Sequence, residues 1–187
     1  AEGLAEMTRY ACWKPGLVPS GWLSWYRARR ACQAQGKRLC TAEEHASGCR
    51  GQNHWKFPYA TDFYQGFCND ALEDGLDPGQ AVPAGSYERC VSPRSGTYDA
   101  SGNLTEWLSV THSVRTDRYM VGGGSWCCEV GDPDDSCRPC SEMQDPEGGT
   151  YWLFDCRADG SVDGSGADFP PAEVKAYFGV RCCYDQP

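Results

Sequence analysis

The segment Asp99–Glu106 (DASGNLTE) is the part of the sequence that says most about an ion. Calcium takes about six to eight oxygen ligands from carboxylates and backbone carbonyls, on a loop that can curl around it. The segment has a carboxylate at each end and a glycine between them, so it predicts a calcium loop. The alternative is that Asp99 and Glu106 only cap turns. Asn103-Leu-Thr105 also matches a glycosylation sequon, but a calcium-wrapped loop would be a poor acceptor.

The 13 cysteines are spread along the chain. So many thiols are unusual in a reducing cytosol unless they bind metal, and their odd number leaves one free, shared with another chain or bound to an ion. Cys137-Arg-Pro-Cys140 has the spacing of a thioredoxin-type redox pair but lacks the βαβ context. Together with Cys127 and Cys128 it could also supply four thiolates to zinc. Structural pairing is the alternative to both.

The other residue types capable of catalysis form no recognisable pattern. The three histidines, His45, His54 and His112, lack metal-ligand spacing, and we interpret them as surface or satisfied polar residues. No Gly-x-Ser-x-Gly elbow or phosphate-binding glycine loop is present. Gly122-Gly-Gly-Ser125 is interpreted as allowing close backbone packing near the core.

Length and composition predict one loop-rich domain over residues 1–187. The chain has 22 glycines and 12 prolines, with 7 tryptophans, 10 tyrosines and 6 phenylalanines to anchor a core. Its formal charge of −9 disfavours nucleic acid and anionic membrane surfaces and favours cations as partners.

The cysteine content predicts an exported protein, extracellular or periplasmic. No apolar stretch is long enough to span a membrane, and the polar residues after Ala1 favour a mature chain whose export signal has been removed. A lipid anchor upstream of Ala1 stays open.

Two helices should position these residues. Aromatic and small residues at three- and four-residue spacing predict a helix that ends at Gly36, with its aromatic face in the core: Trp22, Trp25, Tyr26, Arg29 and Cys32. Thr41 and Glu44 have capping-box spacing, which predicts a second helix from Ala42 to about Cys49.

Strands are predicted at Glu106–Val110, Arg118–Gly122, Tyr151–Cys156 and Ala176–Cys183. Between Phe57 and Thr97 the apolar residues are interrupted by turn signals, so loops with only short strands are expected there. Residues 129–149 are acidic and rich in proline and glycine, and we interpret them as an insertion loop.

Four short motifs occur in an order that resembles the formylglycine-generating (sulfatase-modifying factor) family, over about Trp22 to Cys183. They are Gly36-Lys-Arg-Leu-Cys40-Thr-Ala-Glu-Glu44, Ser101-Gly-Asn-Leu-Thr-Glu-Trp107, Gly122-Gly-Gly-Ser-Trp126 and Phe178-Gly-Val-Arg-Cys-Cys183. The resemblance implies an α+β fold of the C-type lectin-like kind.

The resemblance also implies the calcium ligands. In the family, the first loop binds calcium through side chains and alternate backbone carbonyls, which here fall on Asp99, Gly102, Leu104 and Glu106. A second family site can be matched to Asn69, Asp70, Asp74 and Leu76. Calcium is the one cofactor that we expect.

Two disulfides, Cys32–Cys182 and Cys49–Cys156, are implied by the pairs found in eukaryotic family members. Cys40 and Cys183 occupy positions where ordinary members lack cysteine and lie near that first pair, so we expect a third bridge between them. Cys68 and Cys90 flank the loop of residues in the seventies and could close it. The pairing of Cys12, Cys127, Cys128, Cys137 and Cys140 stays open.

The family's active site is degraded in this sequence. Family enzymes bind copper(I) with two cysteines, and only the first has a match, Cys128. Tyr151 stands at the position of the second, and a phenol does not replace a thiolate for copper(I). The three-histidine iron site of the related sulfoxide synthases has no counterpart either. We therefore expect no catalytic residue and no formylglycine-forming activity.

The leading hypothesis is an exported, calcium-stabilised, catalytically degenerate member that binds a protein or a glycan through its surface loops, or is a structural part of an extracellular assembly. The insertion at 129–149 is the expected contact surface, and an oligomer or interchain disulfide would use the odd cysteine. The alternative is a copper- or iron-dependent oxidase with a rearranged site.

Overall fold

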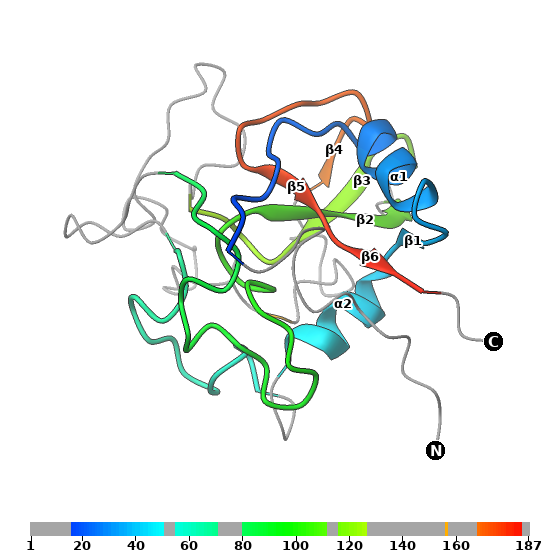
Figure 1. Cartoon of the computed structure of the whole chain (residues 1–187). Helices are drawn as coiled ribbons and strands as arrows, with labels where there is room; N and C mark the ends of the chain where they lie inside the picture. The colour runs from blue at the N-terminus through cyan, green and yellow to red at the C-terminus, as the bar shows by residue number, and fades with distance from the viewer. Residues whose placement is uncertain are drawn as a thin grey trace, which may run out of the picture.

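The computed structural model describes residues 16–50, 55–70, 80–111, 116–126, 156 and 168–184. Figure 1 shows two helices against strands from both halves of this chain. The elements are α1 (Trp25–Gln33), β1 (Arg38–Leu39), α2 (Ala42–Cys49), β2 (Thr105–Thr111), β3 (Tyr119–Gly122), β4 (Asp168–Phe169), β5 (Phe178–Val180) and β6 (Cys182–Cys183). The expected α+β class is confirmed.

The strands form a four-stranded sheet in the order β4-β3-β2-β5 and a two-stranded sheet of β1 and β6. Strand β2 is central: it runs antiparallel to β3, with Glu106 opposite Gly122, and parallel to β5, with Glu106 opposite Gly179. The β1–β6 pair places Arg38 opposite Cys183. The last part of the chain thus lies beside both the middle of the sheet and the segment after α1 (Figure 1).

Helix α1 begins later than its sequence pattern predicts. Ser24 is the N-cap, with its side chain accepting from the backbone N–H of Arg27, and Trp22 lies outside the helix in a left-handed conformation with φ of 57°. Trp22 is 56% exposed and Tyr26 53% exposed, so the expectation that both rings belong to the core is wrong. The reason is rotational, because the buried residues Trp25, Ala28 and Cys32 define a helix face that excludes position 26.

Helix α2 spans Ala42–Cys49, as the capping signal predicts. The N–H of Glu44 donates to Thr41 Oγ1 at 3.2 Å, and the N–H of Thr41 donates to Glu44 Oε2 at 2.8 Å. Both halves of the capping box are therefore formed.

The predicted strands differ in detail from the observed ones. The stretch Ala176–Cys183 is not one strand but two, β5 and β6, separated at Arg181, whose side chain turns into the interior. Within the described part of the loop region 57–97, the only strand-like pairing is a single bridge between Val91 and Tyr98. The predicted strand Tyr151–Cys156, except Cys156, and the insertion 129–149 lie outside the described residues.

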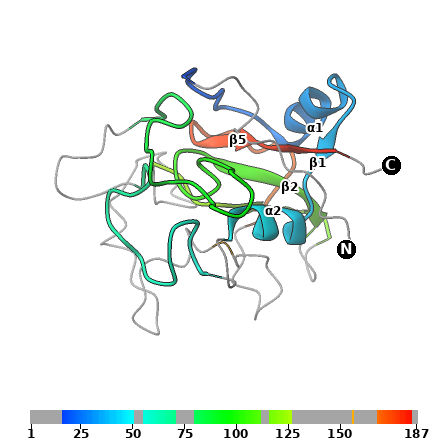
Figure 2. The ribbon, with the colours of Figure 1, turned by 60° about the horizontal axis from the view of Figure 1, so that its bottom comes forward.

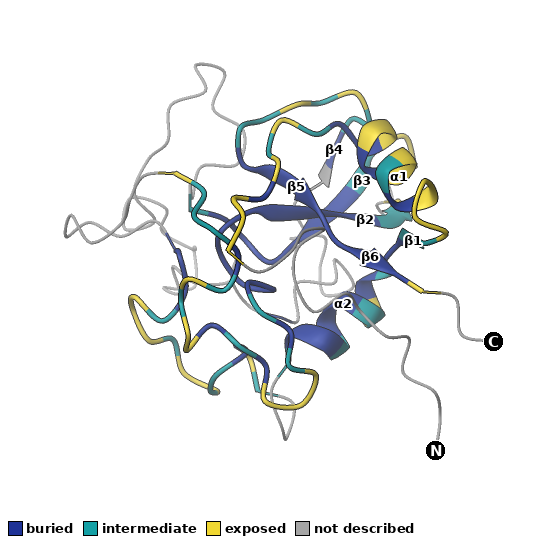
Figure 3. Ribbon diagram, viewed as in Figure 1, coloured by how far each residue is buried: buried dark blue, intermediate teal, exposed yellow. Residues whose placement is uncertain are grey.

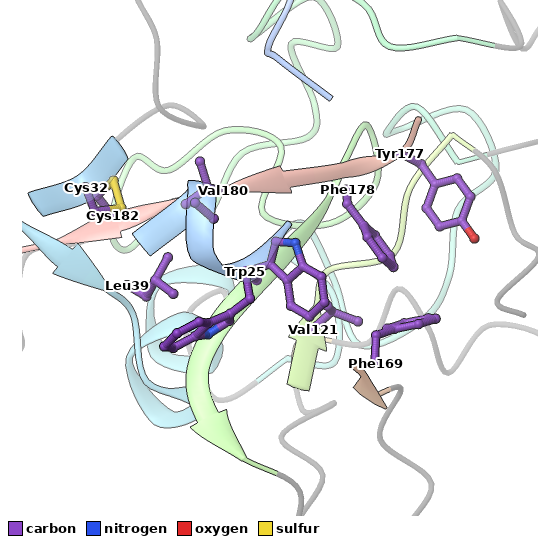
Figure 4. Close-up of a cluster of buried hydrophobic side chains, with 11 residues drawn as sticks. Trp25, Cys32, Leu39, Val121, Phe169, Tyr177, Phe178, Val180 and Cys182 are labelled. Carbon is purple, nitrogen blue, oxygen red and sulfur yellow. A yellow bond between two sulfur atoms is a disulfide. The ribbon is translucent and has the colours of Figure 1, made fainter. Parts of the chain in front are cut away.

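The main core lies between α1 and the sheet (Figure 4). It comprises Trp25, Ala28, Cys32, Leu39, Trp107, Val121, Phe169, Tyr177, Phe178, Val180 and Cys182. Two indole N–H groups are satisfied by backbone carbonyls: Trp107 Nε1 donates to Leu23 at 2.6 Å and Trp25 Nε1 donates to Leu108 at 2.9 Å. Figure 3 shows the sheet buried and the outer side of α1 exposed. Among the described residues, no helix is long and apolar enough to cross a membrane.

The structure contains all four expected disulfides: Cys32–Cys182, Cys40–Cys183, Cys49–Cys156 and Cys68–Cys90. Each of the eight cysteines in these disulfides is 2% exposed or less. Two of the bridges tie the α1–β1 region to the adjacent cysteines of β6, and a third ties the end of α2 to Cys156.

Candidate functional site

A buried ionic cluster surrounds Glu106 of β2. Arg181, between β5 and β6, donates from Nε to Oε1 at 3.0 Å and to Oε2 at 2.8 Å. His45 of α2 places Nε2 3.2 Å from Glu106 Oε2. Helix α2 lies next to β2, as Figure 2 shows, and all three side chains are 4% exposed or less.

The environment keeps Glu106 ionised. Burial alone raises the pKa of this carboxyl group, but the Arg181 charge and the neighbouring His45 outweigh it and hold the pKa below its ordinary value. Arg181 also donates from Nη2 to the carbonyl of Tyr98 at 2.9 Å. Glu106 and Arg181 thus form a buried ion pair, and His45 of α2 lies beside it.

Two glycines of the motif Gly122–Ser125 make room for the histidine. A Cβ at Gly122 would lie 3.1 Å from His45 Cε1, and one at Gly123 would lie 2.8 Å from the carbonyl oxygen of Ala100. Gly123 also has a φ of 88°, which favours glycine. The interpretation of this motif as a site of close backbone packing is confirmed.

Sequence reasoning missed the roles of His45 and Arg181. His45 is not at the surface as one expectation had it: it is buried against the Glu106 carboxylate, and its Nε2 makes no hydrogen bond within the described residues. The signal was present in the two motifs that carry Glu106 and Arg181, since adjacent parallel strands bring them together. His54 and His112 lie outside the described residues.

Asp99, the other acidic residue of the predicted calcium loop, is 2% exposed. Its Oδ2 accepts a hydrogen bond from the backbone N–H of Gly85 at 2.7 Å. Burial is the largest influence on this carboxyl group and raises its pKa from the ordinary 3.8 to about 6, against the lowering effects of Gly85 and of the Arg181 charge. Its backbone has a left-handed φ of 53°, which an aspartate tolerates better than most residues.

We expect Asp99 to make the folded protein less stable as the pH rises from about 4 to about 7. A folded-state pKa of about 6 lies above the ordinary 3.8, so the folded protein binds the proton more tightly than the unfolded chain. The stabilisation is present below pH ~4 and is lost through pH ~6, by up to about 3 kcal/mol. Urea titrations in a chelator, at intervals across this range, would measure the slope.

Asp99→Asn is the matched variant, because its amide oxygen can still accept from Gly85. It should flatten the slope between pH ~4 and ~7. Glu106, whose pKa is lowered, acts with the opposite sign and loses its stabilisation as the pH falls, so it cannot mimic this effect. An unchanged slope in the variant would show that another group titrates.

The first predicted calcium set fits the ion poorly. Both carboxylate oxygens of Glu106 accept from Arg181, and a calcium ion would have to share them with a guanidinium. Gly102 and Leu104 are expected to ligate through their backbone carbonyls. The N–H of Gly102 donates to the carbonyl of Gly123 at 2.6 Å and the Leu104 side chain is buried against Gly179, contacts that involve neither carbonyl and leave both untested. The loop does curl, with left-handed residues at Asp99, Gly102 and Asn103. Its charge is nevertheless balanced from within the protein.

The second predicted set fits a cation better. Asn69 is 1% exposed, and its Nδ2 donates to the carbonyl of Gln80 at 3.0 Å and to Asn103 Oδ1 at 3.1 Å. Asn103 Oδ1 also accepts from the N–H of Val82 at 2.9 Å, which fixes both amide orientations. Asn69 Oδ1 then has no hydrogen-bond partner among the described residues, next to the buried Asp70. Asp74 and Leu76 lie outside the described residues.

The described cysteines offer no thiolate, since all eight are in disulfides. In this part of the chain no three or more His, Cys, Asp or Glu side chains are grouped as a metal site. Cys128 and Tyr151, the residues on which the copper argument depends, lie outside it, as do Cys12, Cys127, Cys137 and Cys140.

Comparison with known proteins agrees with this architecture. The chain is 34% identical over 120 residues to "Inactive C-alpha-formylglycine-generating enzyme 2" of Bos taurus, a match over 56% of this chain and 37% of that protein's length. The chain thus spans little more than a third of that relative.

Two solved structures share the fold. The crystal structure of CarF aligns with a TM-score of 0.59 at 17% identity, over 89% of this chain and 67% of that one. PvdO from Pseudomonas aeruginosa aligns with a TM-score of 0.61 at 14% identity, over 90% and 62%. The model of the sulfatase-modifying factor enzyme 1-like domain matches residues 8–153. Since that match covers most of the sequence, the chain belongs to the sulfatase-modifying factor (formylglycine-generating enzyme-like) domain family.

Proposed function

We propose that this chain is a catalytically degenerate member of the family that works as an exported binding module for a protein or a glycan. A copper(I) site needs free thiolates, and the sequence supplies a match for only one of the family's two cysteines. The observation that carries the proposal is that all eight described cysteines are bridged and buried, so none of them can serve as the second thiolate. The similarity to a relative whose name includes "inactive" also supports the loss of catalysis.

Export is supported by the same bridges, because four buried disulfides are typical of oxidising compartments. The fold is also suited to ligand binding without chemistry. Its rigid part is tied by cystines and an internal ion pair, while loops leave the sheet on one side (Figure 1). In such scaffolds, loops on a rigid framework are the usual place for recognition.

The decisive experiment is an oxidation assay with the purified, copper(I)-loaded protein. A peptide with the Cys-x-Pro-x-Arg pattern of family substrates should remain unoxidised, as followed by mass spectrometry. An active family enzyme is the positive control. Formation of the aldehyde by this protein, and its loss in Cys128→Ser, would contradict the proposal and establish an oxidase with a rearranged site.

Calcium is part of this proposal, with the Asn69–Asp70 segment as the better-supported site. A cation there would give Asn69 Oδ1 the partner it lacks among the described residues and would neutralise negative charge beside it. Calcium at about 100 times its Kd would stabilise the fold by about 2.7 kcal/mol. For a chain of this size that corresponds to a Tm increase of roughly 5–10 °C.

The expected result is that calcium raises Tm and that Asn69→Ala removes the increase. Asp99→Asn is the comparison, because the first loop is already balanced by Arg181. If Asn69→Ala keeps the calcium response and Asp99→Asn loses it, the first loop holds the ion instead. A Tm that responds to neither calcium nor chelator, in protein shown by elemental analysis to be free of metal, would contradict calcium binding altogether.

A further inference from the structure

The outward face of α1 carries an unusual concentration of positive charge for this protein. Tyr26, Arg27, Arg29 and Arg30 are all exposed, and we call these four residues the α1 basic face. The helix sequence, WYRARRACQ, contains no acidic residue. Residues three apart are neighbours on a helix, so Arg27 and Arg30 lie side by side, while Arg29 lies further round the helix toward Trp25. Figure 3 shows this side of α1 as exposed.

None of these three arginines makes an ion pair within the described structure, whereas Arg38, just after the helix, binds Glu44 at 2.6 Å. Arg29 lies with Cζ 5.3 Å from the centroid of the Trp25 ring, which holds its side chain against the surface without neutralising it. The nearby loop contributes Glu173, but its carboxylate is paired with Lys175 at 3.6 Å.

The segment before the helix exposes the indole of Trp22, whose backbone is held in a strained conformation. Trp22 has a left-handed φ of 57°, which costs a bulky residue about 1–2 kcal/mol. The backbone is held there from both sides: the N–H of Trp22 donates to Lys175 at 3.0 Å and that of Leu23 to Phe178 at 3.2 Å. Trp22 is nevertheless 56% exposed. Residues held in such sparsely populated conformations cluster at functional sites and ligand clamps.

Local charge, not the net charge of −9, decides what this face attracts. At physiological ionic strength the screening length is about 8 Å, so acidic residues elsewhere on the chain contribute little to the field at α1. A negatively charged partner is therefore compatible with an acidic protein, provided that it docks at this helix.

The chemistry of the face distinguishes between anionic partners. The apolar side of α1 is already packed in the core through Trp25, Ala28 and Cys32, so the helix has no face left to insert into a membrane. Guanidinium groups bind sulfate with paired hydrogen bonds, and exposed aromatic rings give sugar rings a flat apolar surface. Trp22 and Tyr26 supply such rings on either side of the helix start.

We propose that the α1 basic face together with Trp22 is a docking surface for a sulfated polysaccharide. The arginines bind sulfate groups and the exposed rings contact the sugars. This inference rests on the proposed function as a binding module and names the surface and the class of ligand.

The test is calorimetric binding of the full chain to a heparin oligosaccharide of defined length, with a desulfated oligosaccharide of equal length beside it. The sulfated form should bind, and raised NaCl should weaken the binding because screening acts on exposed charges.

Variants of the α1 basic face test which residues make the contact. Arg27→Ala/Arg30→Ala should raise Kd about tenfold. Lys56→Ala/Arg94→Ala is the matched control: it removes the same charge from exposed positions outside α1 and should leave Kd unchanged. Trp22→Ala and Tyr26→Ala should each weaken binding, with folding checked by circular dichroism.

Absence of heparin binding, equal loss in both double variants, or equal affinity for the desulfated sugar would overturn the proposal. So would tighter binding to phosphatidylserine vesicles or to duplex DNA than to heparin. The peptide oxidation assay on the same preparation separates the two levels. A protein that neither binds heparin nor oxidises the peptide loses this inference but keeps the proposed function, whereas peptide oxidation contradicts the proposed function itself.

Discussion

Arg181→Met should lower the free energy of unfolding by about 3–5 kcal/mol, because it leaves the Glu106 carboxylate buried without its counter-charge. The carboxylate is 1% exposed, so water cannot replace the guanidinium. The variant also removes the hydrogen bond that Arg181 Nη2 donates to the carbonyl of Tyr98. Urea unfolding at pH 7, followed by tryptophan fluorescence, would measure the loss.

Two further variants separate charge burial from packing. Adding Glu106→Gln to Arg181→Met should recover at least half of the loss, since the neutral amide carries no unpaired charge. Arg38→Met is the matched control, because it breaks the pair with the partly exposed Glu44 and should cost about 1 kcal/mol or less. Similar costs for Arg181→Met and Arg38→Met would show that the buried cluster has no special weight.

Local signals in the sequence predict local structure well. The capping box at Thr41 and Glu44 gives the start of α2, because two short-range hydrogen bonds determine where the helix begins. The strand at Glu106 is found within one residue of its observed start. Helix α1 is less well predicted, because Trp22 fits the helical spacing but lies beyond the Ser24 cap.

The ionic cluster is beyond local reasoning. Glu106 and Arg181 are far apart in the sequence and meet only because β5 pairs in parallel with β2. A carboxylate in an acidic loop looks like a calcium ligand when its neighbours are unknown. The structure gives that carboxylate an arginine and a histidine, and it leaves an amide oxygen of Asn69 without a hydrogen-bond partner among the described residues. Motif spacing identifies the residues, and the topology decides their partners.

The family's disulfides transfer because they depend on which elements are adjacent, and the motifs preserve that adjacency. Of the two remaining bridges, Cys40–Cys183 follows from its position beside the first family pair, and Cys68–Cys90 from two cysteines that flank one loop. Cys40–Cys183 joins β1 to β6, where the backbones are already hydrogen-bonded partners one residue from the Leu39–Cys182 pair. The result is two bridges side by side between the same two parts of the chain, a redundancy with consequences for stability.

Removing both Cys32–Cys182 and Cys40–Cys183 should cost more than the sum of the two single removals. While one bridge remains, the other closes only the short ring through residues 32–40 and 182–183, so its loss by paired alanine substitution costs about 3 kcal/mol. When both are lost, a much longer ring opens, since the bridges have sequence separations of 150 and 143. Even with Cys49–Cys156 shortening that ring, the combined loss should reach about 7 kcal/mol.

Cys68→Ala/Cys90→Ala provides the control for this non-additivity. That bridge closes a separate loop with a sequence separation of 22, and its removal should cost about 3 kcal/mol. Combined with loss of Cys32–Cys182, it should give a sum of the single effects within about 0.5 kcal/mol. Calorimetric unfolding of the five variants and the parent would complete both cycles. Equal additivity in the two cycles would mean that the bridges of β6 do not restrain the same loop of the unfolded chain, and that they stabilise the protein mainly through their own packing in the core.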